Sequence, residues 1–186
     1  MKLRKTYKKI ISSAGKLFAQ RGYFGVSLSQ IAQKAGITKA GLYYYFDSKE
    51  ELYLAVLQET FSSLFTHLQN AVSLAPTPLA KLFNVIEAYL TFTLHRPEVI
   101  LLTDHDWAEE SIVCEFTSQA RQQLIQFITN LIRTLGKGVE VSEAKIVFFL
   151  SLLLEIIHWP FLLALTTPKK LAEEMINFFF PQIVSE

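Results

Sequence analysis

The sequence has little that would cross-link the chain or break it into long loops. Its single cysteine, Cys114, excludes a disulfide within the chain and fits a reducing compartment, so we expect a cytoplasmic protein. Seven glycines and six prolines are scattered along 186 residues, and no low-complexity tract occurs. Charged residues reach only 19%, whereas apolar residues reach 51%. This balance favours a chain that buries surface in a partner or a ligand pocket over a disordered one.

Signals for secretion and for catalysis are also missing. The basic start resembles a signal peptide, but Ser12, Ser13 and Lys16 break the apolar stretch that would have to follow, so we expect no secretory segment. The chain has no glycine-rich phosphate loop, no strand to present a nucleophile and no paired metal-ligand motif. We therefore expect neither an enzyme nor a bound cofactor or metal.

One polar cluster, Asp104, His105 and Asp106, leaves room for another interpretation. It could form the rim of a pocket for a cationic ligand, or a metal site. Residues adjacent in sequence seldom converge on one ion, and no matching ligand spacing occurs elsewhere. A solvated loop is the favoured interpretation.

Charge is divided unevenly along the chain. Residues 1–54 hold ten basic and three acidic side chains, a net charge of +7, although the whole chain carries only +1. Such asymmetry indicates a basic module that meets a polyanion, joined to an acidic module with another role. A solvated basic face is the alternative.

Apolar spacing and capping residues predict three short helices near the N-terminus. The first carries an apolar stripe, Ile10, Ala14, Leu17 and Phe18, and should end at Gly22. Ser27 and Gln30 form a capping box for a second helix that should end at Gly36. Thr38 can cap a third helix, Lys39–Phe46, and Ser48 with Glu51 forms a second capping box that opens a longer helix.

The rest of the chain reads as longer, more apolar helices separated by breakers. Thr77 and Pro78 should start a helix that His95-Arg96-Pro97 interrupts. A long helix follows from near Ser111 to Leu135, and two more are predicted near residues 142–165 and 168–180. No period-two run of useful length occurs, so the predicted class is all-α with about nine helices.

The second and third helices, joined by Gly36-Ile37-Thr38, have the helix-turn-helix pattern, whose second helix fits the DNA major groove. Three successive tyrosines, residues 43–45, point about 100° apart, so at least one hydroxyl must face outward, where it can reach phosphate. Gly41 inside this helix indicates either a close approach by another molecule or tight packing against the first helix.

The segment Ile31–Leu52, IAQKAGITKAGLYYYFDSKEEL, together with FAQRGY at residues 18–23 and Ser27, resembles the signature of the TetR family of bacterial repressors. The resemblance covers about fifty residues. It implies a three-helix DNA-binding domain, residues 1–47, and a helical effector-binding and dimerisation domain, residues 48–186. It also implies that Ser27 touches phosphate, that Thr38, Lys39 and Ala40 lie at the groove, and that Tyr43, Tyr44 and Lys49 bind the DNA backbone. Family members often have His in place of Tyr45, and Gly or Pro in place of Ala40.

The resemblance further implies that the last two helices, near 142–165 and 168–180, form a homodimer interface. From residues alone, Ile146–Leu165 is apolar on every face and long enough to lie in a core or to span a bilayer. Glu155, His158 and Pro160 argue against a span. We expect no membrane partner, although a membrane-associated helical protein, or a helical ligand-binding module that does not bind DNA, stays open as an alternative.

The sequence thus predicts a ligand-responsive regulator, a repressor by resemblance, that binds a pseudo-palindromic double-stranded operator as a homodimer and is released by a small apolar effector. Aromatic residues between the DNA-binding and dimer helices are the candidates for the effector pocket, although most should be core. They are Phe61, Phe65, Phe83, Tyr89, Phe92, Trp107, Phe116 and Trp159.

Overall fold

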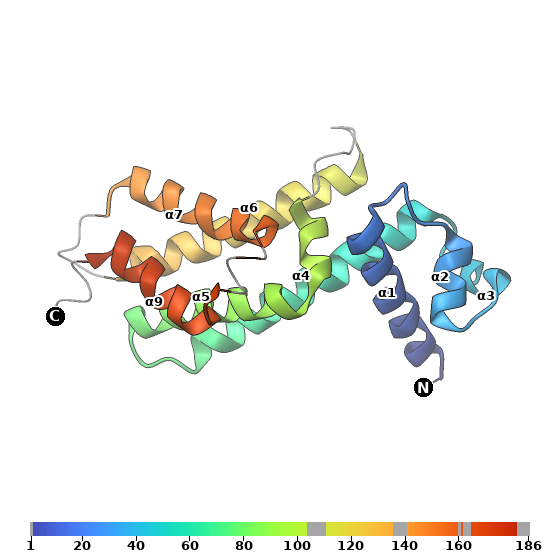
Figure 1. Cartoon of the computed structure of the whole chain (residues 1–186), viewed down its shortest axis with the longest axis horizontal. Coiled ribbons are helices and arrows are strands. Elements are labelled where there is room, and N and C mark those ends of the chain that lie inside the picture. Colours follow the sequence, from blue (N-terminus) through green and yellow to red (C-terminus); the bar gives the residue numbers. More distant parts are fainter. Residues whose placement is uncertain (1, 104–110, 136–140, 160, 162–164, 182–186) are drawn as a thin grey trace. The chain divides into compact units, whose positions relative to one another are not determined.

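The computed structural model describes residues 2–103, 111–135, 141–159, 161 and 165–181. All regular elements in these ranges are helices, which confirms the all-α prediction (Figure 1). In chain order they are α1 (Lys2–Arg21), α2 (Leu28–Ala35), α3 (Lys39–Tyr43), α4 (Lys49–Ser73), α5 (Pro78–His95), the 3-10 helix η1 (Pro97–Thr103), α6 (Ile112–Arg133), α7 (Glu143–Glu155), the 3-10 helix η2 (Ile156–His158) and α9 (Pro168–Phe179). Within these residues, no helix has the length and apolarity that a membrane crossing requires.

The chain divides into two compact units, each of which combines two stretches of sequence. The first consists of Met1–Ser62 and Pro97–Ala120, and the second of Ser63–Arg96 and Arg121–Glu186, in their described parts. Helices α4 and α6 each contribute residues to both units.

In the first unit, α1, α2 and α3 form where the capping signals predict them. The apolar stripe of α1 is buried, and Gly22 follows its last residue with a φ of 68°, a left-handed conformation that suits glycine. Gly36, with a φ of 70°, ends α2 in the same way. Figure 1 shows α2 and α3 beside α1 in the blue part of the chain.

The core of the first unit also takes in residues from a distant part of the sequence. Leu101 of η1 and Val113 of α6 are buried in the same cluster as the apolar residues of α1 to α4. The partly buried side chains of Ile100, Leu102 and Phe116 pack against that cluster. A stretch about fifty residues downstream of the helix-turn-helix therefore helps to hold it together.

In the second unit, α5 packs against α9 and α7 also contacts α9. Thr77 caps α5 by accepting a hydrogen bond from the Ala80 N–H at 3.2 Å, and Pro78 occupies the first turn, as predicted. The core contains the fully buried rings of Tyr89 and Phe149, and Phe149 packs edge-on to Phe180 at 5.3 Å.

Two helices end earlier in the structure than the sequence predicts. The prediction Lys39–Phe46 is wrong at its end, because α3 stops at Tyr43 and the N–H groups of Tyr45 and Phe46 both donate to the Leu42 carbonyl. This turn buries the Phe46 side chain, which stacks on Tyr7 at 5.6 Å. Burial of this ring outweighs continuation of a short, marginal helix.

The second correction concerns the predicted helix 142–165. Its α-helical part, α7, ends at Glu155, and η2 carries the chain only to His158. Trp159 has a φ of −122° and a ψ of 59°, outside the helical region. The physical reason is Pro160, since proline disfavours the helical conformation of the residue before it.

Candidate nucleic-acid interface

The start of α2 presents a complete capping box. The Gln30 N–H donates to the Ser27 hydroxyl at 3.3 Å, and the Ser27 N–H donates to the Gln30 side-chain oxygen at 2.8 Å. Two N–H groups that the helix leaves without partners are thus satisfied. Ser27 remains exposed at this positive helix end, where a phosphate would be favoured.

Helix α3 buries one side chain in the core and exposes the residues at its N-terminal end. Leu42 is fully buried, whereas Thr38, Lys39 and Ala40 are exposed. Thr38 caps the helix by accepting a 3.0 Å hydrogen bond from the Gly41 N–H. The exposed face therefore carries the residues that the resemblance assigns to the groove.

The three tyrosines differ in exposure. Tyr44 is 75% exposed and Tyr43 is 46% exposed, which confirms that at least one hydroxyl faces outward. Tyr45 is partly buried and packs edge-on against Tyr44 at 5.3 Å. The Lys39 ammonium lies 5.8 Å from the Tyr43 ring centroid. These side chains form a cationic and aromatic surface with free hydrogen-bonding capacity.

Gly41 lies next to the Thr38 hydroxyl that caps the start of α3. A Cβ atom built there would lie 3.2 Å from the Thr38 hydroxyl and 3.9 Å from the Ile37 side chain, with no α1 atom among these contacts. The interpretation that Gly41 permits tight packing against the first helix is therefore wrong. Close approach by another molecule stays a prediction.

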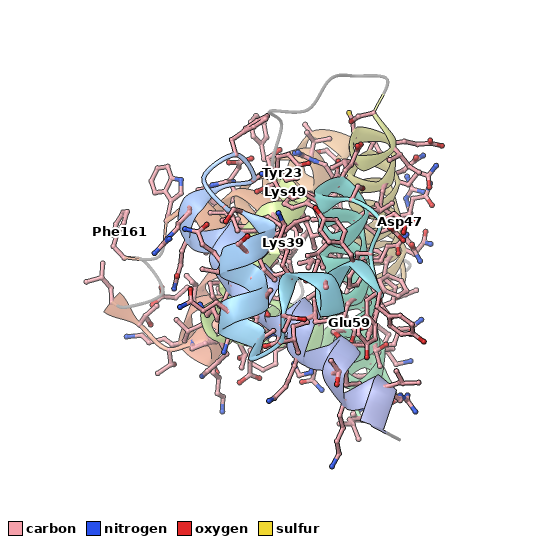
Figure 2. All side chains as sticks on the ribbon, turned by 90° about the vertical axis from the view of Figure 1, so that its right-hand side faces the viewer. Tyr23, Lys39, Asp47, Lys49, Glu59 and Phe161 are labelled. Carbon is pink, nitrogen blue, oxygen red and sulfur yellow. The ribbon has the colours of Figure 1, made fainter. Side chains whose placement is uncertain are left out.

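Lys49 joins the start of α4 to the loop before α2. Its Nζ atom donates a 2.9 Å hydrogen bond to the Val26 carbonyl oxygen. The same atom lies 4.1 Å from the centroid of the Tyr23 ring, and both side chains are labelled in Figure 2. Desolvation by partial burial lowers the pKa of Lys49 from its usual value. The sequence alone does not predict this contact, because the partners lie 23 residues apart and no local pattern links them.

Of the two hydrogen bonds expected in the second capping box, at Ser48 and Glu51, one is formed. The Glu51 N–H donates to the Ser48 hydroxyl at 3.0 Å, as predicted. The Glu51 carboxylate, however, accepts from the Asp47 N–H at 2.6 Å, one residue before the expected donor. The turn that ends α3 brings the Asp47 amide into reach of this carboxylate.

The predicted effector residues are divided between the two units. In the first unit, the Phe61 and Phe116 rings pair edge-on at 6.2 Å. In the second unit, Phe65 pairs with Phe127 at 5.2 Å, and Phe92 with His67 at 5.6 Å.

The remaining described candidates, Tyr89 and Trp159, differ in burial. Tyr89 is buried in the core of the second unit, whereas Trp159 is 51% exposed and stacks on Phe161 at 6.0 Å. Trp107 and the cluster of Asp104, His105 and Asp106 lie outside the described residues.

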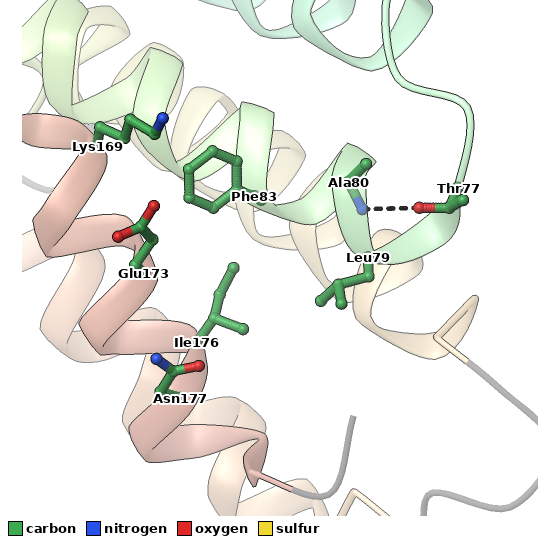
Figure 3. A pocket seen from close by; sticks show the side chains of 8 residues that line it. All are labelled: Thr77, Leu79, Ala80, Phe83, Lys169, Glu173, Ile176 and Asn177. Carbon is green, nitrogen blue, oxygen red and sulfur yellow. Dashed lines mark hydrogen bonds between the residues drawn. The ribbon is translucent and has the colours of Figure 1, made fainter. Parts of the chain in front are cut away.

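The second unit contains a pocket of about 480 Å³ between the start of α5 and α9. Phe83 and Ile176 point into it from opposite helices, and Lys169 and Glu173 lie at its edge (Figure 3). Thr77, Leu79, Ala80 and Asn177 complete the lining. Of the aromatic candidates that the structure describes, Phe83 alone is among the lining residues. The volume of the pocket falls in the range of small-molecule sites.

A three-helix unit with a capped second helix, a short turn and an exposed third helix defines a helix-turn-helix domain. Residues 10–56 match the family model described as bacterial regulatory proteins, tetR family. The chain belongs to the tetR family of bacterial regulatory proteins and carries the family's helix-turn-helix domain at its N-terminal end.

A curated relative covers more of the chain. The HTH-type transcriptional activator FasR of Mycolicibacterium smegmatis is 29% identical over 140 residues, 75% of this chain and 64% of FasR. The chain therefore matches less than two thirds of the length of this relative.

Two solved structures share the fold. A TetR-like transcriptional regulator from Rhodococcus sp. RHA1 has a TM-score of 0.80 at 20% identity, with 97% of each chain covered. AibR, crystallised with isovaleryl coenzyme A and operator DNA, has a TM-score of 0.75 at 23% identity, with 95% of this chain and 98% of AibR covered.

Proposed function

We propose that this protein is a ligand-responsive transcriptional repressor that binds a pseudo-palindromic operator as a homodimer. The single observation that carries the proposal is the exposed face of α3. Thr38, Lys39 and Tyr44 are exposed there, whereas the Leu42 side chain is buried in the core of the unit. The Thr38 hydroxyl caps the start of the helix. We assign the DNA contacts to residues 1–47 and the first residues of α4.

Specific roles follow from the positions of these side chains. Ser27, at the start of α2, and the hydroxyls of Tyr43 and Tyr44 are assigned to phosphate. Lys39 and Ala40, near the start of α3, are assigned to base edges, since the N-terminal part of a recognition helix enters the groove.

A homodimer is supported by exposed apolar side chains on the helices that the family resemblance places at the interface. Val147 and Phe148 on α7 are 58% and 69% exposed, and Phe178 on α9 is 79% exposed. Leu152, Trp159, Phe161 and Leu165 are exposed as well. Apolar side chains clustered on adjoining helices mark an interaction surface. A second copy of the chain would cover them and pair two recognition helices on a palindrome.

An effector that binds the second unit would supply the ligand response. The AibR structure, which contains isovaleryl coenzyme A, supports an apolar acyl group as the class to test first. The pocket that Phe83 and Ile176 line offers a suitable apolar volume. Differential affinity of such a ligand for two dimer shapes, worth about 1–3 kcal/mol, is enough to release DNA.

The decisive experiment is selection of duplexes from a random pool by the purified protein at two salt concentrations. We expect a pseudo-palindrome to be enriched and its affinity to fall steeply with salt. Expression of a reporter behind that operator should rise when the protein is absent. If no duplex is retained at either salt concentration, the proposal fails and a ligand-binding module without DNA becomes the leading function.

A further inference from the structure

A hollow of about 360 Å³ between α1 and the end of α2 is lined by four lysines and no acidic residue. Lys5, Lys8 and Lys9 come from α1, and Lys34 comes from the last turn of α2. Ser12, Ser13 and Ala35 complete the lining. All four lysine side chains are exposed.

Within the described part of the chain, these lysines have no counter-charge. None of the four forms a hydrogen bond or an ion pair with another described residue. Helix α1 contains no acidic residue at all. Lys5 and Lys9 are four residues apart on one helix face, an arrangement of like charges that destabilises a helix. Basic residues close to a helix N-terminus are unfavourable for the helix dipole too.

These lysines repel one another and weaken α1 as long as no counter-ion is bound. An anion bound between them would remove this repulsion, which explains why the sequence keeps them together. The two serines next to the lysines add hydroxyl donors, which phosphate oxygens accept. Ammonium and hydroxyl groups in this number match a phosphate rather than an apolar ligand.

The position of the hollow identifies the source of the phosphate. Ser27 and Lys34 lie at opposite ends of α2. Eight helical residues span roughly 12 Å, about the width of the DNA major groove. The first helix of a helix-turn-helix crosses the DNA backbone, so both of its ends can reach phosphates. At the C-terminal end, where the negative end of the helix dipole would repel phosphate, Lys34 and the α1 lysines supply the positive charge.

We propose that this lysine hollow is a second phosphate-binding surface for the DNA backbone, separate from the residues of α3. The proposal rests on the proposed function, because it assigns further contacts to the same DNA. It adds affinity that does not depend on base sequence, since phosphate contacts carry no sequence information.

The test compares the wild type with a triple variant, Lys5→Gln, Lys8→Gln and Lys9→Gln, on the selected operator and on a scrambled duplex. Glutamine keeps helix propensity, and circular dichroism confirms the fold. We expect the slope of log K against log salt concentration to become less steep by about 0.9 for each phosphate that the variant no longer neutralises. Over two protomers, the reduction should be about 2 or more on both duplexes.

A control variant with the same change of charge is Lys16→Gln, Lys81→Gln and Lys145→Gln, whose residues lie outside the hollow. It should keep the wild-type slope. If the two triple variants have equal slopes, the proposal is overturned even though the wild type binds DNA.

A third arm uses vesicles of phosphatidylserine and phosphatidylcholine. Loss of vesicle binding in the first triple variant, with an unchanged DNA slope, would assign the hollow to lipid headgroups and overturn the DNA assignment. Absence of DNA binding by the wild type would instead overturn the proposed function itself.

Discussion

The Nζ atom of Lys49 donates a 2.9 Å hydrogen bond to the carbonyl oxygen of Val26. The bond ties the start of α4 to the residue directly before the Ser27 cap. The family resemblance assigns Lys49 to the DNA backbone, yet its ammonium is held within the protein by Val26 and by the Tyr23 ring. Lys49 therefore positions the cap of α2, whether or not it also meets phosphate.

Replacing Lys49 by Met should lower the free energy of unfolding by about 1 kcal/mol, since the variant can form neither the charge-assisted hydrogen bond nor the cation–π interaction. Urea unfolding measures this change, and operator affinity should fall with it. Lys39→Met, on the exposed face of α3, is the control and should change stability by less than about 0.5 kcal/mol. Unchanged stability in Lys49→Met, with weaker DNA binding, would show that Lys49 acts through phosphate alone.

Lys39 and Tyr44 should affect DNA binding in different ways. Lys39→Ala removes a side chain assigned to base edges and should change the order of preference among operator variants, at about 1–3 kcal/mol for the base concerned. Tyr44→Ala removes a phosphate contact and should weaken binding to all sequences by a similar factor. A binding panel of single-base operator variants distinguishes the two. Identical profiles for both substitutions would contradict these roles.

The sequence predicts those features of the fold that are encoded over three or four residues. The caps at Ser27, Thr38 and Thr77 each join a side chain to an N–H three residues later, so the chain pattern contains the whole interaction. The break in the helix at Trp159 is also encoded, by Pro160, but the long apolar pattern conceals it.

Contacts between distant residues could not be predicted in this way. The Lys49 bond to Val26 and the burial of Leu101 beside the helix-turn-helix depend on tertiary packing. The lysine hollow is intermediate, because Lys5, Lys8 and Lys9 share a helix face in sequence, but only the packing of α2 brings Lys34 to them.

Gly41 should be needed for DNA binding more than for folding. Alanine gains about 1 kcal/mol of helix propensity, but its Cβ would lie 3.2 Å from the Thr38 hydroxyl and disturb that cap. The two effects offset each other, so thermal unfolding of Gly41→Ala should shift by only a few degrees. Operator affinity should fall at least tenfold if the DNA approaches this backbone. Gln20→Ala, at an exposed position of α1 with no assigned DNA contact, is the control and should keep the wild-type operator affinity.

Tyr89 should make the protein sensitive to alkaline pH. Burial raises the pKa of the Tyr89 hydroxyl far above its usual value of 10.0. Above pH 10 the unfolded chain loses this proton while the folded chain keeps it, so the free energy of unfolding falls as pH rises. The contribution between pH 8 and 10.5 is about 0.8 kcal/mol.

Urea unfolding at both pH values should therefore show a smaller fall for Tyr89→Phe than for the wild type. Tyr44→Phe, at a position 75% exposed, is the control and should behave as the wild type. An equal fall in all three proteins would show that the Tyr89 hydroxyl ionises as freely in the folded state as in the unfolded state.

The exposed aromatic side chains on α7 and α9 provide the test of dimerisation. Phe148→Asp and Phe178→Asp each place a charge where the proposed interface would exclude water, at a cost of several kcal/mol. Light scattering should give twice 21.2 kDa for the wild type and a shift toward 21.2 kDa for each variant. Operator affinity should fall at least tenfold, since one recognition helix contacts only half of a palindrome. Leu74→Asp, at an 81% exposed position beyond α4, is the matched control and should leave the dimer intact. A wild type with the mass of a monomer, or variants that remain dimeric, would assign these side chains to another partner.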